Sequence, residues 1–189
     1  MLHLDDGNTL YADAVLLTAP VRQSLELLAA GDVELDSDDH DALGAIRYDR
    51  CIAVLAPLRG ASGFPEPGAV DPNVGPIDWM ADNHIKGVSS ASAVTIHADV
   101  EFSTAHWETT DDVVITELLR AADLDGEPIE PAVQVQRWRY ARPALLHPQR
   151  CLVAAGVPTL ICAGDAFGGA KVEGAALSGI AAGEAFARR

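Results

Sequence analysis

The sequence predicts a mixed α/β (α+β) protein in which most of the strands are antiparallel. Three observations support this fold class: short aliphatic or alternating runs typical of strands, amphipathic segments with helical spacing, and a C-terminal helix built mostly of Gly, Ala and Ser. The chain has 189 residues, of which 49% are hydrophobic. It is therefore long and apolar enough to bury a sizeable core.

The N-terminal part is expected to form a hairpin, a strand and a helix in that order. Residues 2–11 surround a turn, Asp5-Asp6-Gly7-Asn8, whose Gly and Asn tolerate a positive φ. Residues 12–18 form a short apolar run typical of a buried strand. Residues 21–30 carry apolar side chains at helical spacing and are followed by Gly31. Residues 32–41 are strongly acidic, which predicts a solvated loop.

The middle and the end of the chain alternate between strands, one long loop and two helices. Thr110 is placed to cap a helix that reaches Ala122. Four glycines and four prolines make residues 60–76 a loop without a core of its own. The final helix, residues 172–187, is rich in small residues that allow close packing. Strands are predicted over residues 51–58 with an end near Pro57, 77–81, 93–98, 133–138 and 160–163.

Charge and cysteine content exclude several classes of function. The formal net charge is -15, and such a surface repels nucleic-acid backbones and anionic membranes, so neither partner is expected. The three cysteines, Cys51, Cys151 and Cys162, are far apart and form no zinc-ligand pattern, which predicts free thiols and no metal. Acidic residues near Met1 are unlike a signal peptide. A soluble, cytoplasmic protein is expected.

The strongest local pattern is a strand that ends at Gly164-Asp165, followed by a glycine-rich turn and the start of the last helix. The pattern places a carboxylate beside a helix N-terminus, whose free N–H groups favour an anionic or electron-accepting group. A carboxylate there also accepts hydrogen bonds from sugar-like hydroxyls. An ordinary strand–turn–helix corner with a capping Asp explains the same spacing equally well.

The segment Leu-Ile-Cys-Ala-Gly-Asp-Ala-Phe, with Lys-Val-Glu-Gly-Ala-Ala-Leu-Ser-Gly after it, resembles the closing flavin motif of FAD-dependent amine oxidases. The resemblance implies that Asp165 holds the ribityl chain and that the backbone near Gly174 approaches the flavin ring. Residues 12–20 resemble the strand that re-enters the FAD domain of that family. The FAD-binding residues implied in this way are Thr18, Pro20, Gly164, Asp165, Val172, Gly174, Ala175 and Ala176.

A narrower resemblance, to renalase-like NAD(P)/FAD-dependent oxidoreductases, rests on three further motifs, which together with the closing flavin motif make four in the family's order. Thr-Ala-Pro-Val-Arg-Gln at 18–23 is the first, and Val-Thr-Ile-His at 94–97 and Arg-Trp-Arg-Tyr at 137–140 follow. It implies that His97 and Trp138 line the substrate side of the flavin, as catalytic residues. A hydrogen-bonded core His and a core Trp are the simpler interpretations. Secondary pocket candidates, each more simply structural, are Trp79, His84, His106, Trp107, Tyr140 and Arg142.

The resemblance implies two domains and two alternative functions. Residues 1–35 and 143–189 would be the remnant of a Rossmann-like flavin domain, and residues 36–142 the substrate domain. A complete family member would transfer hydride from a reduced nicotinamide or an amine to FAD and then to dioxygen. The sequence contains no Gly-x-Gly-x-x-Gly, the motif that binds the ADP half of FAD. The alternative is therefore a truncated, non-catalytic fragment that binds little FAD, and self-association or a second chain is expected.

Overall fold

The computed structural model describes residues 1–72, 75–157 and 159–188. It confirms the predicted fold class, since the protein is mixed α+β and most of its strand pairs are antiparallel. The chain divides into two compact units: Met1–Tyr48 with Arg142–Arg189, and Asp49–Ala141. Each unit is described separately below, as units 1 and 2.

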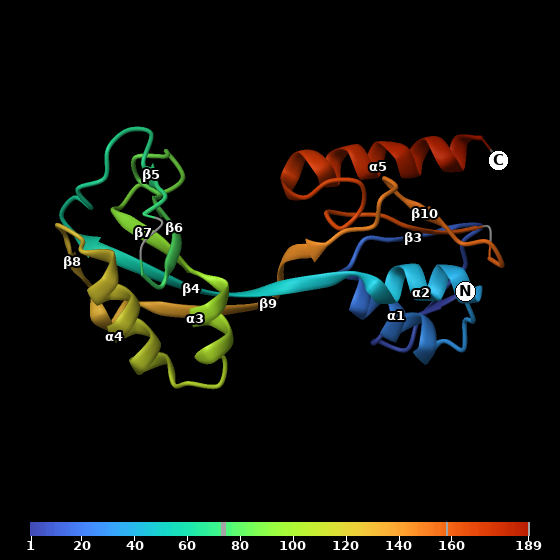
Figure 1. Ribbon diagram of the computed structural model, residues 1–189, viewed down its shortest axis with the longest axis horizontal. Helices are drawn as coiled ribbons and strands as arrows, with labels where there is room; N and C mark the ends of the chain where they lie inside the picture. Colours follow the sequence, from blue (N-terminus) through green and yellow to red (C-terminus); the bar gives the residue numbers. More distant parts are fainter. Residues whose placement is uncertain (73–74, 158, 189) are drawn as a thin grey trace. The chain divides into compact units, whose positions relative to one another are not determined.

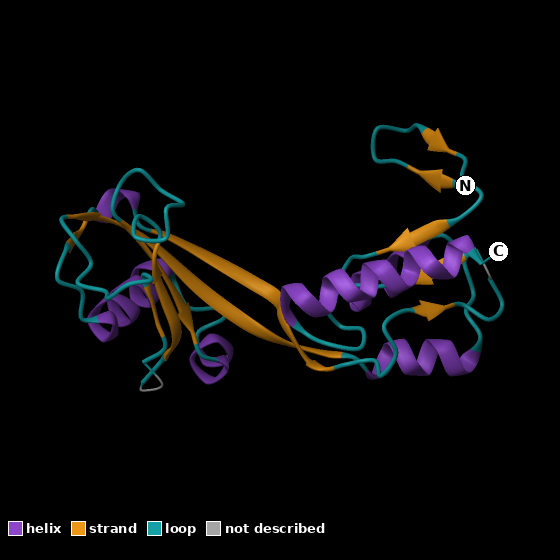
Figure 2. Ribbon diagram, turned by 90° about the horizontal axis from the view of Figure 1, so that it is seen from above, coloured by secondary structure: helices purple, strands orange, loops and turns teal. Residues whose placement is uncertain are grey.

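Unit 1 contains a hairpin and a small sheet. The hairpin pairs β1 (Leu2–His3) with β2 (Thr9–Leu10), as predicted, and is separate from the sheet (Figure 2). The sheet has the order β10 (Leu152–Val153), β11 (Leu160–Cys162), β3 (Val15–Leu17). Strands β11 and β3 are parallel, whereas β10 and β11 are antiparallel. The parallel pair is the feature that positions the candidate site of this unit.

Helices cover both faces of the sheet in unit 1 (Figure 1). Helices α1 (Val21–Ala30) and α2 (Ser37–Ala45) lie on one side, where Leu28 and Leu43 pack with apolar strand residues such as Leu160. Helix α5 (Lys171–Ala187) lies on the other side, where Ala182 packs against Ile161. A helix–sheet–helix arrangement of this kind suits a short parallel pair, because both faces of such strands are apolar.

Helix α2 replaces the solvated loop predicted for the acidic run, and that prediction was wrong. The Asp36 carboxylate caps the helix by accepting a hydrogen bond from Asp38 N at 3.0 Å, and acidic residues in the first turn suit the helix dipole. Leu43, 1% exposed, and Ile46 then anchor the segment in the core of unit 1. For this reason the boundary between the units falls after Tyr48 and not at residue 35.

Unit 2 is built on an antiparallel sheet with the strand order β5-β6-β7-β4-β8, and β9 also pairs with β4. Strand β4 continues beyond the predicted end at Pro57, because its last two residues pair with β8. The loop predicted at 60–76 contains the short strand β5. The strands are β4 (Arg47–Arg59), β5 (Ala69–Val70), β6 (Ile77–Asp82), β7 (Ala93–Ala98), β8 (Glu127–Pro128) and β9 (Gln134–Leu145).

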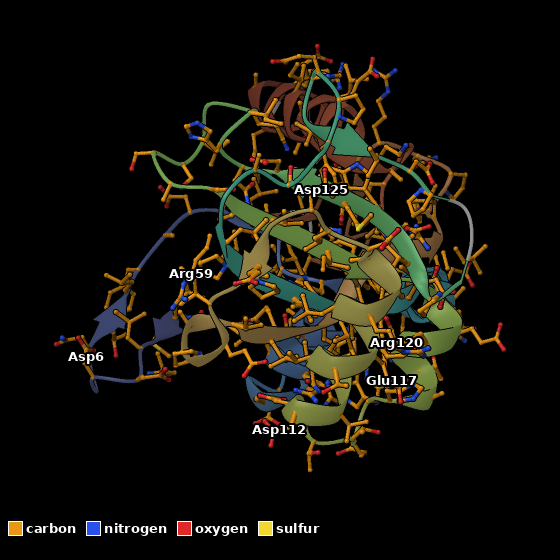
Figure 3. The ribbon with its side chains drawn as sticks, turned by 90° about the vertical axis from the view of Figure 1, so that its left-hand side faces the viewer. Asp6, Arg59, Asp112, Glu117, Arg120 and Asp125 are labelled. Atoms are coloured by element: carbon orange, nitrogen blue, oxygen red, sulfur yellow. The ribbon has the colours of Figure 1, made fainter. Side chains whose placement is uncertain are left out.

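Two helices cover one face of this sheet. Helix α3 (Val100–Ala105) was not predicted, whereas α4 (Asp111–Ala122) has the predicted bounds. Val114 and Leu118 of α4 are fully buried against Val54 and Ile96 of the sheet. Figure 3 shows the polar side chains Asp112, Glu117 and Arg120 on α4. A 3-10 turn, Glu130–Ala132, precedes β9.

Within the described part of the chain, no helix is long and apolar enough to cross a membrane.

Candidate functional site

The first candidate site lies at one edge of the sheet in unit 1, where the carboxyl ends of two parallel strands meet. Leu17, the last residue of β3, is in register with Cys162, the last residue of β11. Thr18 therefore lies beside Ala163 and Gly164, and Ala163 N donates to Leu17 O at 3.0 Å. The structure thus brings together the two segments that the sequence analysis assigned to FAD, around Thr18 and around Gly164. Ligands of open α/β sheets bind at this kind of edge.

Gly164 makes the sharp change of direction after β11. Its φ of +144° lies in a region that favours glycine, and its N–H donates to Oγ of Ser178 at 2.9 Å. Ser178 is the eighth residue of α5 and is fully buried. This hydrogen bond fixes the end of β11 to the helix that follows, so the position of Asp165 is set by both elements.

Asp165 is the half-buried carboxylate of this edge. Burial raises the pKa of the Asp165 carboxyl group, and a hydrogen bond from its own backbone N–H partly opposes that change. No hydrogen bond from another residue to this carboxylate is found among the described residues. A carboxylate in such a position gains most from an external donor, because desolvation without a partner is unfavourable. The group is therefore suited to bind hydroxyl groups of a ligand.

The glycine-rich turn packs directly on the first turns of α5. A Cβ atom at Gly174 would collide with the backbone carbonyl of Gly169, so the two glycines allow a backbone-to-backbone approach. Pro20 is the N-cap residue of α1, and Ala175 is half-buried in α5. The side chain of Val172 is 86% exposed. Ala176 is also exposed, so only the Gly174 side of the helix faces the turn.

The second candidate site is the face of the unit 2 sheet that α3 and α4 leave uncovered. Strand β7 alternates regularly, with Val94, Ile96 and Ala98 buried under the helices and Thr95 and His97 on the other face. The pairing of β6 with β7 shifts register between Ile77 and Trp79, which marks a β-bulge. A bulge turns the next side chain to the opposite face of the sheet. It thereby places Trp79 directly beside His97.

Trp79 and His97 form a ring pair on this open face. Their centroids are 5.1 Å apart and their planes are tilted by 46°. Burial lowers the pKa of the His97 imidazole, and although Asp78 opposes this effect, Lys86 adds to it. The imidazole of His97 is therefore neutral at pH 7, and it can accept or donate one hydrogen bond. Asn83 Nδ2 donates to Thr95 Oγ1 at 2.9 Å on the same face.

Trp138 lies on β9 and is 55% exposed. Val135 packs against the core under the helices, so Trp138, three residues later, faces the uncovered side. Strand β4 separates β9 from β7, and within the described residues no ring contact joins Trp138 to His97. The structure therefore pairs His97 with Trp79, a residue that the sequence ranked as secondary. The bulge that pairs them has no signature in the local sequence.

Several other candidates have structural roles. Trp107 is 8% exposed in the helix-covered core, under the guanidinium of Arg50. His106 stacks on Phe102, and His84 bonds to Ser89 O at 3.1 Å in an exposed turn. None of the three cysteines forms a disulfide bond, and burial raises the pKa of the most buried, Cys162, to about 11. No group of His, Cys, Asp and Glu that could hold a metal occurs in residues 1–72, 75–157 and 159–188.

Comparison with solved structures supports the fold of the chain. An oxidoreductase from Methanosarcina mazei matches with a TM-score of 0.63 and 15% identity, over 95% of this chain and 44% of that protein. The PF1083 protein from Pyrococcus furiosus matches with a TM-score of 0.52 and 19% identity, over 97% of this chain and 43% of that protein. The chain thus spans less than half the length of both neighbours. No family model and no curated protein matches the sequence.

Proposed function

We propose that this chain forms part of an FAD-dependent oxidoreductase of the amine-oxidase or renalase type. The observation that carries the proposal is the half-buried Asp165 carboxylate, held at the carboxyl end of β11 beside the parallel strand β3. The sequence resemblance assigns that position to the ribityl chain of FAD. The Methanosarcina mazei neighbour, which shares the fold, is named an oxidoreductase.

The residues of unit 1 are compatible with the part of FAD that the resemblance assigns to them. The Asp165 carboxylate is free to accept hydrogen bonds from ribityl hydroxyls. The close approach of Gly169 to Gly174 leaves backbone, without side chains, on that side of α5. The flavin supplies the chemistry by accepting a hydride, and the protein supplies position and polarity. Thr18, Pro20, Gly164, Val172, Ala175 and Ala176 complete the proposed binding segment.

In unit 2, the uncovered sheet face is the proposed site for the hydride donor. His97 offers a neutral imidazole that can orient a donor by one hydrogen bond, because burial disfavours its protonation. Trp79 beside it offers a flat apolar surface, and Trp138 is an exposed ring on the same face of the sheet. The donor would be a reduced nicotinamide or an amine, with dioxygen as the final acceptor.

A second function is favoured by a specific observation. The sequence has no Gly-x-Gly-x-x-Gly motif for the ADP half of FAD. Without that contact, these 189 residues alone would hold FAD weakly, and the chain would then be a non-catalytic fragment of the same family. The two alternatives make opposite predictions for the retention of FAD by the purified chain.

Absorption spectroscopy after incubation with FAD and removal of the excess tests the proposal. A flavin band near about 450 nm that stays with the protein supports the oxidoreductase. Asp165→Asn should then weaken FAD binding by about tenfold or more, because a hydrogen bond to a charged group contributes about 1.5–3 kcal/mol. Asp41→Asn is the matched control, since it removes the same charge from unit 1 at a side chain that is 89% exposed.

The outcomes separate the two alternatives. Retained FAD that is bleached without oxygen by a reduced nicotinamide or an amine supports catalysis by this chain. A colourless protein supports the fragment. Equal FAD affinity in the Asp165→Asn and Asp41→Asn variants would refute the role given to Asp165.

We also propose that the chain associates with itself or with a second chain. Val172 and Ile180 of α5 are 86% and 59% exposed, and Leu16 on β3 is 42% exposed. Large apolar side chains exposed on a helix and a neighbouring strand favour association. Size-exclusion chromatography with light scattering measures this, and a stable monomer at all concentrations would contradict it.

A further inference from the structure

The turn after β6 carries a cation beside the ring pair of unit 2. Lys86 Nζ lies 5.0 Å from the centroid of the Trp79 ring, a distance at which a cation is attracted to an aromatic face. Lys86 is also the only Lys or Arg between Arg59 and Arg120 in the sequence. In a chain with a net charge of -15, it provides a positive charge beside Trp79 and His97.

The position of Lys86 is fixed by the turn that carries it. The buried Asp82 carboxylate accepts hydrogen bonds from His84 N at 2.7 Å and from Ile85 N at 3.1 Å. Ser62 Oγ donates to the other carboxylate oxygen of Asp82 at 2.5 Å. Lys86 N donates to Asp82 O at 3.1 Å. The backbone of Lys86 is therefore held in place without any ligand.

The ring pair and its surroundings form a surface suited to a flat molecule. Trp79 and His97 are half-buried, so part of the surface of each residue is accessible. Leu55, on the strand paired with β7, is 41% exposed on the same face. Flat apolar groups with one placed charge beside them are typical of sites that bind small aromatic ligands.

We propose that this face of unit 2 binds planar aromatic ligands that carry one anionic group, with the ring on Trp79 and His97 and the anion at Lys86. The inference rests on the proposed function, because it concerns the same face. Of the two donors proposed there, it favours a reduced nicotinamide, whose ring is planar and whose phosphate groups are anionic, over an amine, which is cationic near neutral pH. Asp78 is the acidic group that acts on His97 from β6, and it would oppose the anion. Lys86 Nζ lies 5.0 Å from the Trp79 ring centroid, so an anionic group beside a ligand ring on Trp79 would meet the ammonium.

Three probes with the same ring and different charges test the inference. Benzoate, benzamide and benzylamine carry charges of about -1, 0 and +1 near neutral pH. The expected order of affinity is benzoate, then benzamide, then benzylamine. Because an exposed charge pair contributes modestly, benzoate should bind about threefold to fivefold more tightly than benzamide. This preference should decrease as the salt concentration rises.

Nuclear magnetic resonance of the three tryptophan indole N–H groups provides the measurement. The Trp79 signal, assigned with Trp79→Phe, should shift with benzoate, whereas the signal of Trp107 in the core should not. Lys86→Met should abolish the preference for benzoate over benzamide, and Lys86→Arg should retain it. Lys86 is exposed, so neither substitution should unfold the protein.

The titrations need no flavin, so their outcome is independent of the FAD experiment. Tighter binding of benzylamine than of benzoate, or an unchanged preference in Lys86→Met, would overturn the inference. No shift of the Trp79 signal with any probe would overturn it as well. A chain that binds benzoate as expected but retains no FAD would keep this inference and remove the oxidoreductase.

Discussion

Replacement of Gly174 by alanine should destabilise the protein, although alanine is the better helix former. Gly174 lies in the first turns of α5, and an added Cβ would collide with the backbone carbonyl of Gly169. Intrinsic helix propensity alone would stabilise the variant by about 0.5–1 kcal/mol. Displacement of a packed backbone segment costs about 1–3 kcal/mol. The collision is with backbone, so the steric term should dominate.

Gly179, five residues later in the same helix, is the matched control. A Cβ atom there meets no atom within 4 Å beyond the neighbouring backbone of its own helix, so Gly179→Ala should gain the propensity term alone. A difference of 1 kcal/mol shifts the melting temperature of a protein of this size by about 2–4 °C. Gly174→Ala should therefore lower the melting temperature by a few degrees, and Gly179→Ala should raise it.

Thermal and urea denaturation followed by circular dichroism measure both variants. Because the turn that contacts Gly174 also carries Asp165, FAD retention should decrease in Gly174→Ala and stay unchanged in Gly179→Ala. A Gly174→Ala variant as stable as Gly179→Ala would refute the reasoning. It would mean that the turn at Gly169 moves away from the helix without a loss of free energy.

Three further predictions concern stability. Ser178→Ala should lower the free energy of unfolding by about 1–3 kcal/mol, because it removes the partner of the Gly164 N–H, and unchanged urea denaturation would contradict this. Arg137→Met should destabilise unit 2, because Arg137 donates hydrogen bonds to Asp111 at 2.6 Å and to two backbone carbonyl groups. Arg139→Met is the control and should not destabilise the unit, because Arg139 is exposed. Equal melting temperatures of the two variants would contradict this. Because the pKa of His97 is lowered in the folded state, the unfolded chain binds its proton first, and stability should fall as the pH decreases below about 7. His97→Gln should flatten that pH dependence of the melting temperature, and an identical slope would show that His97 does not contribute.

Local sequence patterns were sufficient to predict most of the helices and strands. Helix α1 and strand β7 have the predicted bounds, Val21–Ala30 and Ala93–Ala98. Each of these elements follows from the periodicity of consecutive residues alone. Helix α1 has apolar residues at helical spacing and ends before Gly31, and strand β7 alternates between apolar and polar residues. Helix α2 was not predicted because its sequence is mostly acidic, whereas its position depends on one apolar contact, that of Leu43 with the core of unit 1.

The sequence by itself therefore determined the mixed fold class, most elements and the family resemblance around Asp165. Tertiary structure decided which residues meet: Thr18 with Gly164 across a parallel pair, and Trp79 with His97 across a bulge. The physical reason is that strand register and bulges are set by pairing between residues far apart in the chain. A shift of one residue turns a side chain to the other face of a sheet, and the local sequence around Trp79 does not predict that shift.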